Sequence, residues 1–505
     1  MLRYFGPPGT GKTTTLLNQV DKFMSEGVSP NEIGYFAFTR KASHEARDRA
    51  VARFNLDPEK DFTYFRTLHS LAFLLMGYNA SEILKETHLK EFSEKIGVDI
   101  TTGSGIEHDD GFQVFRSNHP IMRCIDLARS TLQGPKQTYH GSDLHVAYYE
   151  FKHIFDEYSK FKKSNGLKDF TDKLVDLSEN PGYIPRLKVA FLDEAQDLTP
   201  LQWKIGHSIS ERADRMFIAG DDDQGIYRWA GADINHFIGL EGGSEVLSQS
   251  HRIPRSVFNV ADSVSKRIKK RQKKVWSPRD ADGSVRRTYD FWGIEFQDEE
   301  WLVMAQAHYM LDELSEHLRS SGYFFERYGQ PSLGKKVRSA ISSWDYLNSG
   351  NNREVTYKEA LNIYDFISAS EGQLARGAKK ILKGASEQDY YSVQTLRQDF
   401  GLEAQGSWDT ALDKIKDEDR AYATALINRG VNLSSKPMIK LSTIHGSKGG
   451  EADNVLLYMD LTGKALEQMA RNPDDAYRVL YVGLTRTKEN LVLKLPENSQ
   501  RGWMI

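Results

Sequence analysis

The sequence holds a single cysteine, Cys124, so the chain cannot form an internal disulfide bond. It has no long hydrophobic run: the longest, around residues 71–76, falls far short of the roughly eighteen residues of a membrane-spanning helix. The first residues lack the charged start and apolar stretch of a secretory signal. A net charge of −3 argues against a chain that is basic as a whole, but not against a local basic patch. We therefore expect a protein of the reducing cytoplasm with no membrane partner.

Internal repeats and low-complexity tracts are also missing, and 505 residues are too many for one compact core. Short apolar runs bounded by turn residues alternate with helical patterns. These runs lie at residues 2–5, 33–38, 189–192, 216–219, 455–459 and 490–495. Buried strands that alternate with helices are typical of parallel α/β sheets. We therefore predict an α/β fold with two parallel-sheet domains, each interrupted by a long, mostly helical insertion.

The predicted domain boundaries follow the strand-rich blocks of the sequence. The first α/β domain covers residues 1–75 and 176–246, with its insertion at 76–175. The second covers residues 247–329 and 437–505, with its insertion at 330–436.

The run GPPGTGKT at residues 6–13 has the G-x-x-x-x-G-K-[ST] pattern of a phosphate loop. Glycines let backbone N–H groups fold around phosphates, Lys12 adds a positive charge, and the Thr13 hydroxyl can ligate Mg²⁺. Apolar residues at helical spacing follow, so the loop would lie at a helix N-terminus. The sequence thus predicts a nucleotide and Mg²⁺ site. Its candidate residues are Gly9, Thr10, Gly11, Lys12, Thr13 and Thr14.

A second acidic motif follows the apolar run at residues 189–192, which ends in Asp193 and Glu194. Asp193 at the end of a strand can hold Mg²⁺, and Glu194 can accept the proton of an attacking water. Taken alone, the pattern also fits a strand followed by a solvated acidic turn. The phosphate loop in the same chain favours the catalytic interpretation.

Three carboxylates at residues 221–223 and Gln224 follow the apolar run at 216–219. Gln224 can hydrogen-bond the γ-phosphate of a nucleotide or its attacking water. Tyr227 and Trp229 offer flat faces on which single-stranded bases can stack, at about 1–3 kcal/mol per base. The alternative is that Trp229 packs in the core.

Eight motifs, in this order, resemble those of UvrD/PcrA/Rep-type superfamily 1 DNA helicases. They are GPPGTGKT (6–13), AFTRKASHEARDR (37–49), TLHSLA (67–72), LDEAQD (192–197), GDDDQGIYRWAGAD (220–233), SHRIP (250–254), STIHGSKGGEADNV (442–455) and YVGLTRTKENLVL (481–493). The resemblance implies two RecA-like domains with ATP in the cleft between them, and 3′ to 5′ movement along single-stranded DNA. It covers both α/β domains but neither insertion.

The resemblance also assigns roles to single residues. It implies that Lys12 and Thr13 bind phosphate and Mg²⁺, Asp193 the metal and Glu194 the water, and that Gln224 senses the γ-phosphate. Arg252 and Arg486 resemble arginine fingers, for which the planar, permanently charged guanidinium is suited. His251 stands at the position that stacks on adenine, and Glu451 at the one that contacts the ribose. The implied DNA contacts are Phe38, Thr39, His69, Tyr227, Trp229, Ser442, Thr443 and His445.

Residues 266–274 (KRIKKRQKK) hold seven basic side chains in nine positions, on an expected helix after SHRIP. Such a charge run fits a solvated face, and a track for DNA phosphates is the second interpretation.

Some positions depart from the family pattern. We expect no adenine-reading glutamine before the phosphate loop, since the sequence leaves no room for it. His251 replaces the usual tyrosine, Ala230 replaces an arginine, and Gly450 and Ala452 replace bulkier residues beside Glu451. With Ala230 we expect one link between the ATP site and the DNA groove to be missing. The other departures concern the nucleotide base, and the phosphate chemistry stays intact. The compact length points to a minimal version, of the kind that a phage or other mobile element encodes.

We therefore predict an ATP-dependent DNA helicase or single-strand translocase that uses ATP and Mg²⁺. Its expected partners are single-stranded DNA and junctions of single- and double-stranded DNA, and the minimal motor is expected to be a monomer. One alternative is an ATPase motor that translocates without unwinding, or that acts on RNA. Another is a nucleotide-gated DNA-binding scaffold, against which the full set of catalytic residues argues.

Overall fold

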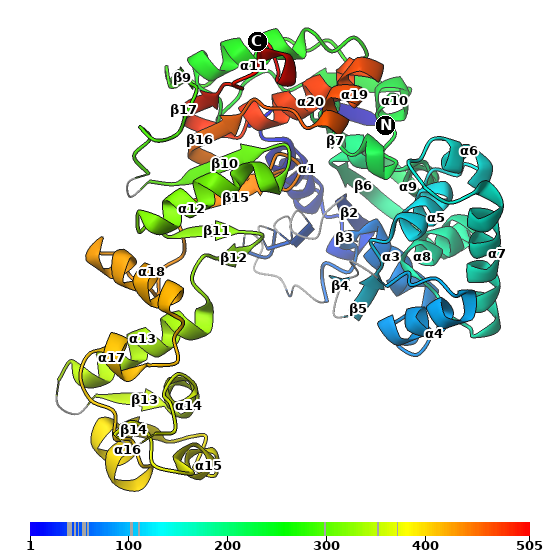
Figure 1. The fold of residues 1–505 in the computed structure, drawn as a ribbon. Helices are drawn as coiled ribbons and strands as arrows, with labels where there is room; N and C mark the ends of the chain where they lie inside the picture. Colours follow the sequence, from blue (N-terminus) through cyan, green and yellow to red (C-terminus); the bar gives the residue numbers. More distant parts are fainter. Residues whose placement is uncertain are drawn as a thin grey trace. The chain divides into compact units, whose positions relative to one another are not determined.

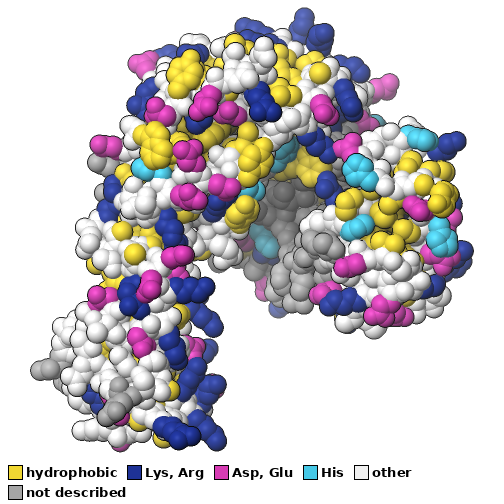
Figure 2. All heavy atoms as spheres, viewed as in Figure 1, with side chains coloured by type: hydrophobic (Ala, Val, Ile, Leu, Met, Phe, Trp, Pro, Cys, Tyr) yellow, Lys and Arg dark blue, Asp and Glu magenta, His cyan; other side chains and the backbone are white. Residues whose placement is uncertain are grey.

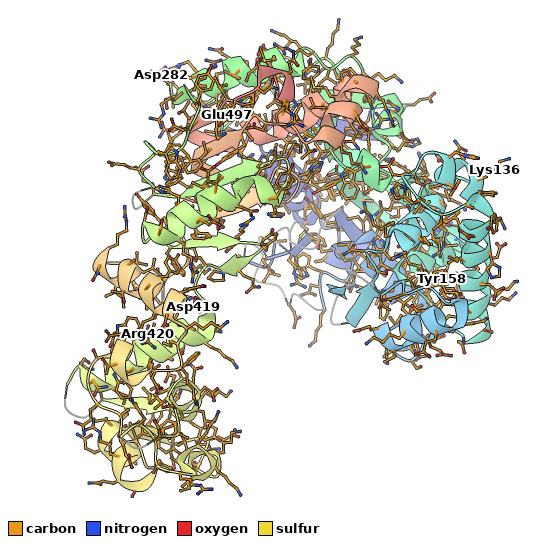
Figure 3. The ribbon with its side chains drawn as sticks, viewed as in Figure 1. Lys136, Tyr158, Asp282, Asp419, Arg420 and Glu497 are labelled. Carbon is orange, nitrogen blue, oxygen red and sulfur yellow. The ribbon has the colours of Figure 1, made fainter. Side chains whose placement is uncertain are left out.

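The computed structural model describes residues 1–37, 43–44, 47–48, 50–52, 57, 60–101, 105–109, 112–296, 299–350, 353–370 and 372–505 (Figure 1). The chain divides into two compact units. The first comprises Met1–Asp282 and Gln468–Thr485, and the second comprises Gly283–Glu467 and Arg486–Ile505. Asp282, where the first unit's long segment ends, is labelled in Figure 3.

A parallel sheet with the strand order β3-β2-β6-β7-β1-β8 forms the centre of the first unit. Its strands are β1 (Leu2–Phe5), β2 (Ile33–Ala37), β3 (Phe65–Thr67), β6 (Leu187–Asp193), β7 (Ala213–Gly220) and β8 (Gly243–Val246). Successive side chains of a strand point to opposite faces. Accordingly, Tyr35 and Phe191 pack in one core, while the next residues, Phe36 and Leu192, pack in another. Apolar cores on both faces explain why these strands are continuous apolar runs rather than alternating ones.

Helices cover both faces of this sheet and build the segment between β3 and β6. They are α1 (Lys12–Ser25), α3 (Leu68–Met76), α4 (Glu86–Ile96), α5 (Pro120–Ser130), α6 (Pro135–His140), α7 (Tyr148–Ser164), α8 (Phe170–Glu179), α9 (Pro200–Glu211), α10 (Ile234–Gly239), α11 (Arg255–Ser265) and α20 (Pro473–Leu484). A hairpin of β4 (Gly105–Asp109) and β5 (Phe112–Arg116) interrupts them. Several helices begin at side-chain caps; Thr199, for example, accepts from Gln202 N at the start of α9.

The second unit has a sheet with the order β12-β11-β15-β10-β16-β17-β9. Its strands are β9 (Ser284–Thr288), β10 (Trp301–Ala305), β11 (Phe325–Arg327), β12 (Gln330–Pro331), β15 (Ile439–Thr443), β16 (Ala452–Tyr458) and β17 (Thr487–Lys494). All neighbours are parallel except β11 and β12, which form a hairpin.

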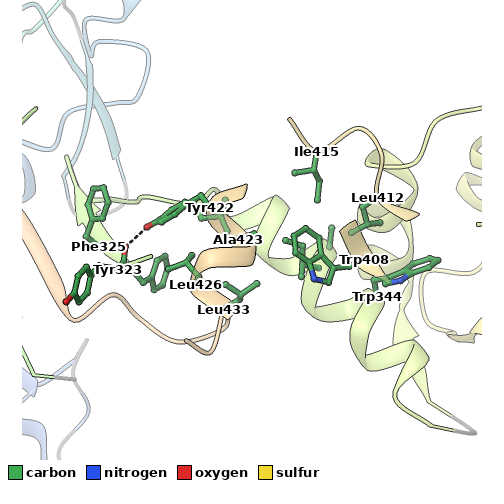
Figure 4. Close-up of a cluster of buried hydrophobic side chains, with 14 of the residues drawn as sticks. Tyr323, Phe325, Trp344, Trp408, Leu412, Ile415, Tyr422, Ala423, Leu426 and Leu433 are labelled. Atoms are coloured by element: carbon green, nitrogen blue, oxygen red, sulfur yellow. Dashed lines mark hydrogen bonds between the residues drawn. The ribbon is translucent and has the colours of Figure 1, made fainter. Parts of the chain in front are cut away.

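A mostly helical segment follows β12 in the second unit. Its elements, with the flanking helices, are α12 (Asp312–Ser320), α13 (Lys335–Asn348), β13 (Glu354–Thr356), α14 (Tyr357–Asp365), α15 (Ala378–Lys383), β14 (Tyr390–Ser392), α16 (Val393–Asp399), α17 (Trp408–Ala411), α18 (Asp417–Asn428) and α19 (Gly463–Arg471). Trp344, Trp408 and Leu412 pack in its core, and Tyr422 and Leu426 of α18 continue that core toward β11 (Figure 4). Lysine and arginine side chains gather along one edge of the lobe built by α13 to α17 (Figure 2).

The predicted fold class is confirmed, because mostly parallel sheets lie between helices in both units. The four-piece division and its boundaries stay a prediction. The helix expected at residues 266–274 is wrong: α11 ends at Ser265, before the basic run begins. None of the helices among the described residues is long and apolar enough to cross a bilayer.

Candidate functional site

The predicted phosphate loop joins β1 to α1 in the first unit. Gly9 and Gly11 have φ angles of 72° and 77°, the left-handed region that glycine adopts at little cost. Gly6 N donates to Gly220 O at 3.0 Å, which ties the loop to the end of β7. Lys12 Nζ donates to Gly6 O at 3.0 Å, so the ammonium lies across the mouth of the loop. The loop therefore has the open backbone and the cation that phosphate oxygens require.

Residues 250–252 hydrogen-bond the backbone of this loop, and we call this contact the clasp. Ser250 Oγ donates to Pro8 O at 2.8 Å, and His251 N donates to Gly9 O at 2.8 Å. A side chain on Gly9 would place its Cβ only 2.4 Å from the Arg252 Cβ. The Cβ of Arg252, the predicted arginine finger, therefore lies against the phosphate loop. The Arg252 Nη1 donates to Thr485 O at 3.5 Å. The exposed His251 ring belongs to the same clasp.

Asp193 and Glu194 lie at the carboxyl end of β6, beside the phosphate loop. Asp193 Oδ2 accepts from Thr13 Oγ1 at 2.9 Å and from Tyr35 OH at 2.9 Å. Burial raises the pKa of Asp193, and the neighbouring Glu194 charge adds to this effect. A bound cation would offset both, and the hydroxyl and carboxylate oxygens are the ligands that Mg²⁺ prefers. Thr13 and Asp193 are therefore placed as a pair that fits Mg²⁺.

Glu194 adopts an unusual backbone conformation. Its φ is 53°, a region that costs a residue with a side chain about 1–2 kcal/mol and that concentrates at functional sites. Glu194 N donates to Asp193 Oδ1 at 2.9 Å, and Gln196 Nε2 donates to Glu194 Oε2. The bond to Asp193 fixes the Glu194 backbone, and the bond from Gln196 holds the Glu194 carboxylate in a fixed direction.

A chain of hydrogen bonds continues from Gln196 to the predicted γ-phosphate sensor. Gln196 Oε1 accepts from Asp221 N at 2.9 Å, and Asp221 Oδ2 accepts from Gln224 Nε2 at 2.6 Å. Both Gln196 and Asp221 are fully buried. Glu194 and Gln224 are thus joined through two intervening residues, the Gln196 side chain and the backbone N–H and side chain of Asp221, which sequence spacing does not reveal.

The three carboxylates after β7 are buried against the basic run. Lys274 Nζ donates to Asp221 Oδ1 at 2.7 Å and to Asp222 Oδ1 at 2.5 Å, and it lies 2.9 Å from Asp223 Oδ2. Arg271 Nε donates to Asp223 Oδ1 at 2.8 Å. Neither interpretation of residues 266–274 holds for Lys274 and Arg271, because they are neither solvated nor available to DNA phosphates.

The predicted nucleic-acid residues of the first unit lie on a partly exposed surface. Trp229 is 52% exposed, which excludes the core alternative. Its ring packs edge-on to Tyr227 with centroids 6.4 Å apart, and the Arg123 Cζ lies 5.4 Å from its centroid. The His69 ring stacks on Phe170 of α8 at 3.8 Å. Phe38 and Thr39 lie outside the described residues.

The second unit holds the remaining predicted residues. Ser442 and Thr443 end β15, and Thr443 Oγ1 accepts from Gly446 N at 3.0 Å in the turn that carries His445. Arg486 is buried, and its Nη1 donates to Gly450 O at 3.3 Å. Glu451 Oε1 lies 3.6 Å from Lys488 Nζ. Arg486 and Glu451 therefore both lie beside Gly450, in the turn that precedes β16.

Sequence reasoning missed Tyr35, Gln196, Arg271 and Lys274. Tyr35 lies within an apolar run, where the pattern indicates only a buried strand. Its hydroxyl is the signal that could have predicted a polar partner such as Asp193. Gln196 stands two positions after Glu194, where only a turn brings it back. The partners of Arg271 and Lys274 lie about fifty positions earlier, and a single sequence carries no signal for that pairing.

Comparison with known proteins places both units in one family. The UvrD/REP helicase N-terminal domain matches residues 5–242, and the UvrD-like helicase C-terminal domain matches residues 419–498. The chain belongs to the UvrD-type helicases of superfamily 1. The N-terminal match contains the phosphate loop, Glu194 and Gln224, and the C-terminal match contains Arg486.

Relatives within the UvrD-type family are distant in sequence. The ATP-dependent DNA helicase PcrA of Bacillus subtilis is 25% identical over 289 residues, covering 54% of this chain and 38% of PcrA. The probable DNA helicase II homolog of Mycoplasma pneumoniae is 22% identical, covering 96% of this chain and 80% of the relative. The putative ATP-dependent DNA helicase YjcD of Bacillus subtilis is 22% identical, covering 97% and 76%. The match thus spans less than half of PcrA but most of the other two.

Proposed function

We propose that this chain is an ATP-dependent DNA helicase that moves 3′ to 5′ on single-stranded DNA. The observation that carries the proposal is the Thr13, Asp193 and Glu194 cluster at the phosphate loop, within a chain of the UvrD-type family. The relatives named above as DNA helicases support both the activity and the substrate.

In the proposed reaction, Lys12 leaves Gly6 O and pairs with the β- and γ-phosphate oxygens of ATP. Thr13 and Asp193 would hold Mg²⁺, which would neutralise charge on the phosphates when bound. Glu194 accepts a proton from the attacking water, and the bond from Gln196 keeps its carboxylate aimed. Gln224 contacts the γ-phosphate or that water, and Arg252 stabilises charge on the transferring group. Arg486 and Glu451 belong to the second unit, and their roles as second arginine finger and ribose contact stay predictions.

For DNA, we propose that Trp229 and Tyr227 stack on bases and that His69 contributes nearby. Half of the Trp229 surface is exposed although tryptophan is usually buried, which supports a stacking role. Ser442, Thr443 and His445 would hold the strand on the second unit. Phe38 and Thr39 stay predictions.

The decisive experiment measures nucleotide hydrolysis with and without single-stranded DNA, together with strand displacement from duplexes that carry a 3′ or a 5′ tail. We expect DNA to stimulate hydrolysis and displacement to occur only from 3′ tails. Glu194→Gln should lower kcat by about 10²–10⁴-fold, because the proton acceptor is lost. Glu179→Gln, an exposed carboxylate at the end of α8, is the matched control.

Several outcomes separate the alternatives. Hydrolysis without displacement would indicate a translocase that does not unwind, and stimulation by RNA alone would change the substrate class. Hydrolysis that survives Glu194→Gln, or binding without hydrolysis, would favour the scaffold. Running ATP, GTP, CTP and UTP side by side tests whether the chain prefers an adenine nucleotide, the preference that we propose for the His251 position.

A prediction for the DNA arm concerns Trp229→Ala. We expect single-strand affinity to fall about 5- to 150-fold, which corresponds to the loss of one stacked base. Fluorescence anisotropy with a labelled oligonucleotide measures the change. Trp292→Ala, which removes a 58% exposed tryptophan of the second unit, is the control. Unchanged affinity in Trp229→Ala would remove Trp229 from the DNA site.

A further inference from the structure

Lys274 is a lysine whose side chain has no exposed surface and is held by three consecutive carboxylates. Its side chain is 0% exposed, as are those of Asp221, Asp222 and Asp223. Burial opposes the charge on Lys274, but the three carboxylates outweigh it and raise its pKa above the ordinary value. Because removing water from an ion costs several kcal/mol, a fully buried lysine persists only where its partners repay that cost.

Asp221 is the member of this group that faces the predicted γ-phosphate sensor. Its Oδ1 accepts from Lys274 Nζ, and its Oδ2 accepts from Gln224 Nε2. Burial alone would raise the pKa of Asp221, but Lys274 and then Lys12 lower it below the ordinary value. An ionised Asp221 is an acceptor only, so it fixes the Gln224 amide with the nitrogen toward Asp221 and the oxygen away from it.

The two lysines that keep Asp221 ionised have different fates in the proposed reaction. A triphosphate in the loop would take up the charge of Lys12. Lys274 lies behind Asp221 with no path to the phosphates, since its ammonium is enclosed by the three carboxylates. It is therefore the counter-ion of Asp221 that remains when nucleotide is bound.

Backbone contacts hold the segment of Lys274 in place. Asp222 Oδ2 accepts from Gln272 N at 2.7 Å, and Asp474 of α20 accepts from the amides of Lys269 and Lys270 at 2.9 Å each. Arg478 Nε donates to Asp222 O at 2.9 Å. The turn that carries Gln224 is thus fixed to residues 269–274 and to α20 at several points.

We propose that Lys274 is a positioning residue for ATP hydrolysis, which acts through Asp221 to hold the Gln224 amide in its reactive orientation. This inference rests on the proposed function, because it assigns Gln224 to the γ-phosphate or its water. Without the ammonium, burial favours the protonated form of Asp221, which can donate as well as accept and therefore no longer fixes the orientation of the Gln224 amide.

The test compares wild type, Lys274→Met, Gln224→Ala and the double variant in DNA-stimulated ATP hydrolysis. We expect Lys274→Met to lower kcat by about 100-fold, the effect of misplacing a catalytic group by about 1 Å. The KM for ATP should change less than about 3-fold, since the phosphate loop is untouched. The double variant should be no slower than Gln224→Ala alone, because both changes remove the same contact. Lys273→Met, an exposed neighbour, is the matched control and should behave as wild type.

A second variant guards against misfolding of Lys274→Met. Lys274→Met with Asp222→Asn restores the wild-type net charge of the group, and the asparagine oxygen can still accept from Gln272 N. This variant should fold, as judged by its thermal unfolding midpoint, and should keep the low kcat because Asp221 still lacks its cation.

Three results would overturn the inference. The first is a wild-type kcat in Lys274→Met or in Lys274→Met with Asp222→Asn. The second is a kcat for Lys274→Met with Gln224→Ala that is lower than that of Gln224→Ala by the full Lys274→Met factor. The third is a rise in KM with kcat unchanged. The proposed function fails separately: if wild type shows no DNA-stimulated hydrolysis, or if Glu194→Gln does not slow it, the fault lies there and not with Lys274.

Discussion

Two buried charge clusters in the first unit use the same chemistry to different ends. The α7–α8 cluster consists of Arg129, Lys162, Asp169 and Asp172, and the Asp221–Asp223 cluster consists of those three carboxylates with Arg271 and Lys274. The first pairs two cations with two carboxylates, whereas the second has a surplus carboxylate.

The α7–α8 cluster serves the start of a helix. Asp169 caps α8 by accepting from Asp172 N at 2.8 Å, and it also accepts from Tyr158 OH at 3.0 Å; Tyr158 is labelled on α7 in Figure 3. In the Asp221–Asp223 cluster, Asp221 instead accepts from Gln224, and, against the effect of burial, the charges of Lys274 and Lys12 lower its pKa. The balanced cluster fixes the start of a helix, whereas the cluster beside the predicted phosphate loop takes part of its charge compensation from Lys12, the residue that we propose pairs with the nucleotide.

The largest expected effect comes from Lys162→Met, which removes one cation from the balanced cluster. Breaking a buried pair typically costs about 3–5 kcal/mol, because the remaining carboxylates are left uncompensated. Hydrogen exchange of the α7 and α8 amides should report this loss as faster local opening. The kcat for DNA-stimulated hydrolysis, per folded molecule, should stay within about 2-fold of wild type. A 100-fold loss of kcat, as expected for Lys274→Met, would erase the distinction between the clusters.

The clusters should also respond differently to acid. Arg129 and Lys162 overcome the effect of burial and lower the pKa of Asp169, so its contribution to stability is present above the unfolded pKa of about 3.9 and is lost as pH falls through the folded pKa. Burial and the neighbouring carboxylates raise the pKa of Asp222 despite Lys274, so its ionisation destabilises the folded state as pH rises through the folded pKa.

Urea unfolding at pH 7, 5.5 and 4 therefore distinguishes Asp169→Asn from Asp222→Asn. Asp169→Asn should be less stable than wild type at all three values, with a deficit that shrinks only below about pH 4. Asp222→Asn should match or exceed wild type at pH 7 by up to about 1 kcal/mol, and its advantage should shrink as pH falls. Deficits of equal size and equal pH dependence would show that the two clusters are equivalent.

The smallest effect sets the baseline for both clusters. Lys188 and Asp214 form a surface pair at 3.3 Å, with side chains 56% and 68% exposed. Lys188→Ala should change the free energy of unfolding by less than about 0.5 kcal/mol, because water and salt screen the pair. If the free energy of unfolding falls by about 2 kcal/mol or more in the same urea assay, burial does not explain why the clusters stabilise the fold more than a surface pair does.

Local patterns predicted the parts of the site that local chemistry dictates. The glycines and Lys12 of the phosphate loop, and the carboxylates at the end of β6, follow from short motifs because each depends on neighbours in the chain. The parallel strands could be predicted because both faces of each sheet are buried, which forces continuous apolar runs.

The basic run shows where local reasoning ends. A run of lysines predicts a solvated helix only if the lysines have no buried partner, and three aspartates about fifty residues earlier supply one for Lys274. The helix then stops at Ser265, and the amides of Lys269 and Lys270 bond Asp474 instead of continuing a helical ladder. The Glu194–Gln196–Asp221–Gln224 chain is equally non-local, since it needs β6 and β7 to lie side by side.

The clasp on the phosphate loop has an evolutionary consequence. At position 251 the bond to Gly9 O uses only the main-chain N–H, so any residue except proline can make it. The side chain at position 251 is therefore not needed to hold the loop. The residue at position 251 can therefore change in the course of evolution without loosening the contact between residues 250–252 and the predicted phosphate loop.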